Sequence, residues 1–85
     1  MTDTASTVEQ VVRAALESVR PDAAGIAGGT DLTRELGLDS LQVMDMVMEI
    51  EDRLDISVPV EVLADARTLD QLCAGIVQIT DRRAA

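Results

Sequence analysis

The chain has 85 residues, of which 47% are hydrophobic and 27% are charged, and its formal net charge at pH 7 is −9. This acidity excludes a surface for nucleic acid or for an anionic membrane, because both require a positive patch, and it favours basic protein partners. The chain has no histidine and one cysteine. It therefore lacks the residues for a serine–histidine catalytic site, a zinc site of His and Cys ligands, or an internal disulfide.

The composition predicts one small helical domain. No aromatic residue is present, so the core must consist of Leu, Ile, Val, Met and Ala side chains, which favours packed helices. We expect a single domain over residues 1–85, with a core at about residues 6–80 and short flexible termini. No apolar run approaches the roughly 18 residues of a membrane span, and residues 1–7 lack a signal-peptide pattern. The chain is therefore predicted to be a soluble, cytoplasmic monomer.

The first predicted helix begins with a capping box, in which Ser6 and Glu9 satisfy backbone groups reciprocally. The Arg20-Pro21 pair ends this helix, because proline cannot continue it. Its apolar residues follow helical spacing and define one core-facing side: Val8, Val11, Val12, Ala15, Leu16 and Val19.

A long connection over residues 21–39 follows the first helix and contains four glycines. A connection of this length is uncommon unless it is functional or locally structured. We expect Thr30–Leu36 to form about two helical turns that direct Leu32 and Leu36 toward the core.

The second helix is predicted over Ser40–Leu54, after a capping box of Asp39 and Gln42. A second apolar row on this helix, beside its core face, exceeds what a small bundle needs. Either the long connection covers this row, or the row is a groove for partner proteins, for which flexible methionine side chains are suited. The core face consists of Val43, Met46, Val47, Ile50 and Leu54, and the second row of Leu41, Met44 and Met48.

Acidic residues surround the same helix. Eight carboxylates lie between residues 39 and 65, and Arg53 is the one basic residue among them. Such a run is usually a solvated face. Together with the second apolar row, it favours a recognition helix with apolar anchors and an acidic rim.

A short helix is predicted at Val60–Ala64, after Pro59, and a last helix after Thr68, which forms a third capping box with Gln71. We interpret Cys73 as a small core residue rather than a reactive thiol. The inward residues of the last helix are expected to be Leu69, Leu72, Cys73, Ile76 and Ile79.

Ser40 admits two interpretations. A serine at the start of an amphipathic helix is most often a cap. Here Asp39 takes that role, which leaves the Ser40 hydroxyl in the first turn and directed outward. A phosphodiester on this oxygen would meet free N–H groups at the positive end of the helix dipole, a contribution of about 0.3–1 kcal/mol. Since the chain has no base to activate the hydroxyl, we predict no catalytic residue and expect another enzyme to modify Ser40.

The segment LGLDSLQVMDMVMEIEDRLDISVP, residues 36–59, resembles the signature of acyl carrier proteins. The shared features are Asp-Ser-Leu at the start of an acidic helix and a hydrophobic-Pro pair after its end. The resemblance extends from about Val8 to about Ile79 and includes the helix order and the long first connection. It implies an all-α fold, a small right-handed bundle of three main helices and one short helix.

The resemblance also implies a 4′-phosphopantetheine arm on Ser40, transferred from coenzyme A by a phosphopantetheinyl transferase. The thiol of the arm would present acyl thioesters to loading enzymes, ketosynthases and other acyl-transferring enzymes with basic surfaces. The residue that matches Asp39 belongs to the motif that the transferase recognises. No metal site is expected. The partner-facing residues would be Leu41, Met44, Asp45, Met48, Glu51 and Asp52, and the core-facing residues of the helix would border a cavity for the acyl chain.

The chain departs from fatty-acid carriers in three places, one of which is the lack of an aromatic residue in the last helix. Leu54 stands where those carriers often have Phe, and residues 60–63 are more apolar than the usual acidic segment. These differences favour a carrier for a polyketide, a hybrid peptide or a specialised lipid. Two alternatives remain: a peptidyl or aminoacyl carrier, and a helical interaction adaptor in which Ser40 is only structural.

Overall fold

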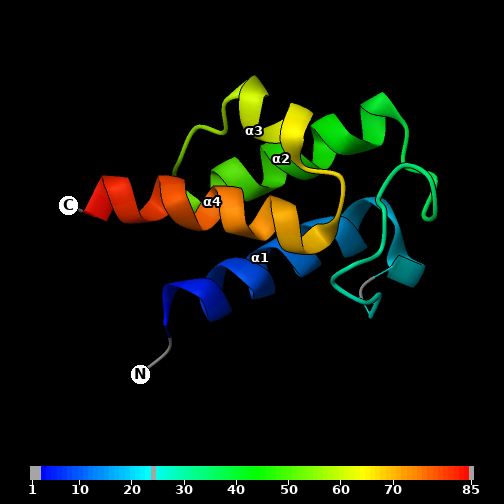
Figure 1. The fold of residues 1–85 in the computed structure, drawn as a ribbon, viewed down its shortest axis with the longest axis horizontal. Helices are drawn as coiled ribbons and strands as arrows, with labels where there is room; N and C mark the ends of the chain where they lie inside the picture. Colours follow the sequence, from blue (N-terminus) through cyan, green and yellow to red (C-terminus); the bar gives the residue numbers. More distant parts are fainter. Residues whose placement is uncertain (1–2, 24, 85) are drawn as a thin grey trace.

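The computed structural model describes residues 3–23 and 25–84, and for residues 82–84 the backbone alone. The described residues form helices and no strand, which confirms the expected all-α bundle (Figure 1). Residues 1–2 and 85, where flexible termini were expected, lie outside the described part. The elements are α1 (Thr4–Val19), the 3₁₀ helix η1 (Pro21–Ala23), α2 (Ser40–Leu54), α3 (Val60–Asp65) and α4 (Leu69–Ala84).

Helix α1 is the centre of the bundle, because it packs against both α2 and α4 (Figure 1). The predicted core face of α2 is confirmed: Met46, Val47 and Ile50 are buried, while Val43 and Leu54 are half-buried against the core. On α4 the inward residues Leu69, Leu72 and Ile76 are buried, and Cys73 and Ile79 pack at the edge. Side chains of α1 complete the centre: Val8, Val12, Ala15 and Leu16.

The predicted start of α1 at Ser6 is wrong. The helix begins at Thr4, and Asp3 is its N-cap, since Oδ1 of Asp3 accepts from the backbone N–H of Ser6 at 2.7 Å. Asp3 therefore has the N-cap role that was expected of Ser6, and the helix begins about one turn earlier than predicted. The predicted end is confirmed, because Arg20 caps the helix and Pro21 opens η1.

The two helical turns predicted for Thr30–Leu36 are also wrong. The segment forms hydrogen-bonded turns, in which Oδ1 of Asp31 accepts from the backbone N–H groups of Thr33 and Arg34. Asp31 forms an isolated antiparallel bridge with Thr68, and the N–H of Leu32 donates to the carbonyl of Arg67 at 2.8 Å. One helical bond remains, from the N–H of Glu35 to the carbonyl of Asp31 at 3.1 Å, but the segment does not continue as a helix. Leu32 is nevertheless buried in the core, as expected.

Helix α3 follows the predicted position and ends one residue later, at Asp65. It packs against α4, where Gly75 lies directly beneath Val62. A methyl group added at Gly75 would lie 2.7 Å from Cγ1 of Val62, so the Val62 side chain packs directly on the α4 backbone and leaves no room for a larger residue there. The connection from α2 to α3 contributes two buried side chains, Ile56 and Val58.

Candidate functional site

The chain reaches the start of α2 through a tight turn. Gly37 has a φ of 79°, in the left-handed region that glycine adopts without strain. Leu38 follows and is buried, and its N–H donates to the carbonyl of Leu32 at 3.0 Å. Leu38 and Val43 stand at the two positions of a hydrophobic staple around the helix start, and both line the same hollow. The turn at Gly37 and the packing of Leu38 therefore fix the direction in which the chain enters α2.

The predicted capping box of α2 is confirmed in both directions. The N–H of Gln42 donates to Oδ1 of Asp39 at 2.8 Å, and the N–H of Asp39 donates to Oε1 of Gln42 at 3.2 Å. Ser40 is the first residue of the helix and is exposed. Because the box uses the Asp39 and Gln42 N–H groups, those of Ser40 and Leu41 remain among the orphan donors of the first turn.

An open hollow of about 410 Å³ lies beside Ser40. Its lining includes Thr33 from the long connection and Val43 and Met44 from α2, together with the turn residues Leu38 and Asp39. The site thus offers an exposed hydroxyl, two unused N–H donors and an apolar wall. A phosphodiester on Ser40 fits this arrangement, since the anion would lie at the positive end of a 15-residue helix.

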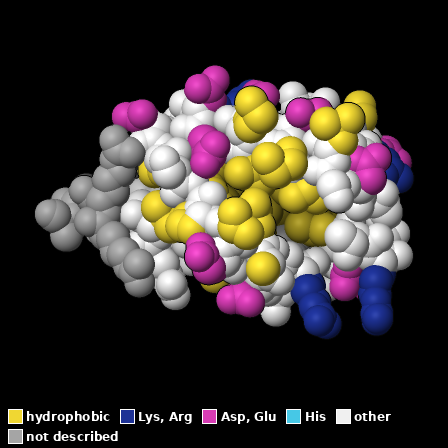
Figure 2. Space-filling view, turned by 90° about the horizontal axis from the view of Figure 1, so that it is seen from above, with side chains coloured by type: hydrophobic (Ala, Val, Ile, Leu, Met, Phe, Trp, Pro, Cys, Tyr) yellow, Lys and Arg dark blue, Asp and Glu magenta, His cyan; other side chains and the backbone are white. Residues whose placement is uncertain are grey.

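The second apolar row of α2 lies on the surface. Leu41, Met44 and Met48 are 71%, 52% and 60% exposed, so the long connection does not cover the row. Figure 2 shows hydrophobic side chains gathered on the face over α2 and α3, with acidic side chains around them. Val60, the first residue of α3, is 75% exposed and was missed by the sequence reasoning. A helix of six residues is too short for its periodicity to show which side faces the core.

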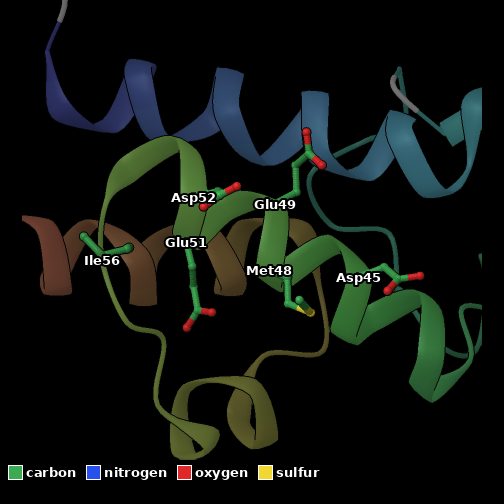
Figure 3. Close-up of a pocket in the computed structure, with 6 residues that line it drawn as sticks. All are labelled: Asp45, Met48, Glu49, Glu51, Asp52 and Ile56. Carbon is green, nitrogen blue, oxygen red and sulfur yellow. The ribbon is translucent and has the colours of Figure 1, made fainter.

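The acidic side chains of α2 border a second open hollow, of about 610 Å³ (Figure 3). Asp45 and Asp52 are exposed there, whereas Glu49 pairs with Arg53 at 2.9 Å. Glu51 differs from these residues, because its Oε2 accepts from the backbone N–H of Val58 at 2.8 Å. The structure therefore brings Asp45, Met48, Glu51 and Asp52 together and gives Glu51 a structural contact that the sequence did not indicate.

Cys73 has no features of a reactive thiol. It is half-buried, and burial raises the pKa of its thiol to about 11, with the charges of Glu9 and Asp70 acting in the same direction. The thiol is therefore protonated at pH 7 and a poor nucleophile. Within the described part of the chain, no group of His, Cys, Asp and Glu residues is arranged to hold a metal ion. None of the helices described is long and apolar enough to cross a membrane.

Comparison with known proteins connects this geometry to a family. Residues 6–76 match the family model described as a phosphopantetheine attachment site. The chain is 31% identical to an acyl carrier protein of Trieres chinensis over 70 residues, which cover 82% of this chain and 84% of that protein. It is 35% identical to an acyl carrier protein of Exiguobacterium sp. over 66 residues, covering 78% and 84%. A probable acyl carrier protein of Caulobacter vibrioides is 46% identical over 39 residues, about half of each chain (46% and 45%). No solved structure matches the chain.

Proposed function

The chain belongs to the acyl carrier proteins of the phosphopantetheine attachment-site family, carriers rather than catalysts, and from this membership we propose that Ser40 holds the 4′-phosphopantetheine arm. The observation that carries the proposal is the exposed Ser40 hydroxyl directly after an N-cap that another residue already supplies. Because Asp39 makes the cap, modification of Ser40 costs the helix no hydrogen bond.

The chemistry at Ser40 requires a separate transferase. In the modification, Oγ of Ser40 forms a bond to the phosphorus of coenzyme A that carries the pantetheine arm, the P–O bond inside the pyrophosphate breaks, and adenosine 3′,5′-bisphosphate leaves. The hydroxyl proton passes to a base of the transferase, since the chain has no histidine to accept it. Once attached, the arm supplies a terminal thiol for acyl thioesters, and tethering raises the effective concentration of the acyl group at each partner.

Intact-mass measurement tests the attachment point. The unmodified chain is incubated with coenzyme A and a broad-specificity phosphopantetheinyl transferase. We expect the mass of one phosphopantetheine to be added to the natural chain and to Ser57→Ala, a matched control because Ser57 is also exposed. We expect no addition to Ser40→Ala. An adduct that persists in Ser40→Ala, or no adduct on the natural chain, contradicts the proposal and favours the adaptor interpretation.

The partner surface in this proposal consists of the exposed row of α2 and its acidic rim. Its residues are Asp39, Leu41, Met44, Asp45, Met48, Glu51 and Asp52. The exposure of Leu41, Met44 and Met48 supports this assignment, because apolar anchors beside carboxylates suit a partner with basic side chains around an apolar pocket. The transferase and the acyl-transferring enzymes would then share one docking helix.

Charge reversal tests this surface. Reversing Asp45 and Asp52 to Arg should lower the rate of transfer to Ser40 by roughly tenfold at low salt, because electrostatic steering is lost. The difference should shrink as ionic strength rises and the Debye length falls below about 8 Å. The double variant Glu17→Arg, Asp81→Arg changes the net charge equally on α1 and α4 and serves as the control. Equal transfer rates for the two double variants at low salt would contradict the assignment of this acidic face of α2 as the partner surface.

The cargo belongs to a polyketide, a hybrid peptide or a specialised lipid in this proposal. Two observations support it: the absence of aromatic residues and the exposed Val60 in a segment that is acidic in fatty-acid carriers. Mass spectrometry of the carrier isolated from its host identifies the acyl group on the arm directly. A linear saturated fatty acyl series as the only cargo would overturn this part of the proposal.

A further inference from the structure

The side chain of Gln42 lies between the start of α2 and the end of α1, which are at the same end of the bundle (Figure 1). It is half-buried and has a different partner on each side. Its Oε1 accepts from the backbone N–H of Asp39 at 3.2 Å, within the capping box. Its Nε2 donates to the carbonyl oxygen of Val19 at 3.5 Å. Gln42 thus joins the helix that begins at Ser40 to the helix that ends at Val19.

The two partners require an amide at position 42. The Asp39 N–H is a donor and the Val19 carbonyl is an acceptor, so the side chain must accept on one side and donate on the other. Val19 is the last residue of α1, where the carbonyls lack N–H partners within the helix and form the negative end of its dipole. An ionised glutamate would accept from Asp39 but would set a negative charge against Val19.

The capping box of α4 provides a contrast within the same chain. Oε1 of Gln71 accepts from two backbone N–H groups, those of Arg67 at 2.8 Å and of Thr68 at 3.2 Å. Gln71 is exposed, and its Nε2 makes no hydrogen bond to another helix among the residues that the structure describes. Two donors that face one oxygen suit a carboxylate as well as an amide. The role of Gln71 is therefore that of a cap alone.

We propose that Gln42 is a positioning residue for Ser40, because its amide holds the start of α2 against the end of α1. Ser40 is two positions before Gln42, in the same helical turn. The hydroxyl is therefore fixed relative to α1, in addition to the turn at Gly37 that precedes it. The inference rests on the proposed attachment at Ser40 for its kinetic test, whereas its stability test uses the unmodified chain.

Exchange of each glutamine for glutamate tests the requirement for an amide. In Gln42→Glu, the equilibrium constant for folding should fall roughly 5- to 30-fold, because the Val19 carbonyl loses its donor and faces a carboxylate. In Gln71→Glu, the matched control, the constant should be unchanged or higher, because a carboxylate is favourable in the first turn of a helix. Urea denaturation measures both constants. Equal effects of the two substitutions would overturn the inference.

Repulsion between the new carboxylate and Asp39 is a second cause of lost stability in Gln42→Glu, and the Asp39→Thr background removes it. This substitution makes the box of α2 the same as the Thr68–Gln71 box of α4, and threonine is a good N-cap. The loss caused by Gln42→Glu should persist in this background. Its disappearance there would assign the whole effect to Asp39 and leave Gln42 no role at Val19.

Transfer kinetics test the positioning of Ser40. In Gln42→Ala, kcat for transfer of phosphopantetheine should fall roughly 3- to 30-fold while KM for the carrier stays within about twofold, because the hydroxyl is displaced and the exposed face of α2 is not. Gln71→Ala, which removes the capping bonds at α4, should leave both constants unchanged. Equal kcat values for the two variants would contradict the positioning role. Absence of transfer to the natural chain would contradict attachment at Ser40, and the stability test would still decide the contact with Val19.

Discussion

Helices α2 and α4 begin with the same capping box. At α2 the two hydrogen bonds join Asp39 and Gln42, at 2.8 and 3.2 Å, and at α4 they join Thr68 and Gln71, both at 3.2 Å. The residue after each N-cap differs in burial, because Ser40 is exposed on α2 and Leu69 is buried on α4, with 1% of its surface exposed.

The difference comes from what covers each helix start. Over α4, the long connection supplies a bridge from Asp31 to Thr68, and the carbonyl of Gly28 accepts from the N–H of Asp70 at 2.9 Å. Over α2, the corresponding positions border an open hollow. A capping box therefore fixes where a helix begins. Whether the next residue is buried in the core or exposed to a partner depends on whether another segment of the chain packs over it.

Truncation of the residue after each cap gives the largest expected contrast. Leu69→Ala should lower the free energy of unfolding by about 2–5 kcal/mol, because it leaves a cavity in the core. Ser40→Ala should change it by no more than about 0.5 kcal/mol, because the side chain is exposed. Urea denaturation followed by circular dichroism measures both. A loss of stability in Ser40→Ala comparable to that of Leu69→Ala would show that Ser40 is structural.

Removal of the two caps should give similar losses of stability and different losses of function. Asp39→Ala and Thr68→Ala should each lower the free energy of unfolding by about 1 kcal/mol, the usual cost of an N-cap. Only Asp39→Ala should also slow transfer of phosphopantetheine to Ser40, because it alters the helix start that the transferase meets. The initial rate of mass increase measures the transfer. An equal slowing in Thr68→Ala would attribute the effect to lost stability and not to the site.

The parts of the fold that the sequence predicted are those fixed by local signals. The bounds of α2 follow from its capping box and from apolar residues at helical spacing, and both signals lie within Asp39–Leu54. The same spacing places Leu41, Met44 and Met48 outside the core face, but it left open whether the long connection covers them. The structure shows that they are exposed.

The features that the sequence did not predict depend on contacts between distant residues or on a choice between equivalent caps. Asp3 and Ser6 are both good N-cap residues, and the pattern could not choose between them. Thr30–Leu36 forms turns instead of a helix, and its Asp31 pairs with Thr68 at the start of α4, more than 30 positions away along the chain. The Glu51–Val58 bond and the exposure of Val60 depend on the path of the chain after Asp55, which no periodicity specifies.

The smallest expected effect on stability comes from the titration of Asp31, which bridges to Thr68 at the covered start of α4. The N–H of Arg34, which donates to the Asp31 carboxylate, holds the pKa of that carboxyl below its ordinary value, and the bonds from Thr33 act in the same direction. Because the folded-state pKa is the lower one, the stabilisation is present above the unfolded-state pKa of about 3.9 and is lost as pH falls through the folded-state value.

Asp31→Asn should therefore be less stable than the natural chain at pH 7, and the difference should shrink below about pH 4. Comparing the two chains at each pH cancels the titration of the other carboxyl groups, so the difference isolates Asp31. Transfer of phosphopantetheine to Ser40 at pH 7 should be equal in the two chains, since Asp31 bridges to Thr68 and not to the open helix start. A stability difference that stays constant from pH 7 to pH 3 would assign the effect to the shape of the side chain and not to its charge. A slower transfer would show that the covered and open helix starts are coupled through the long connection.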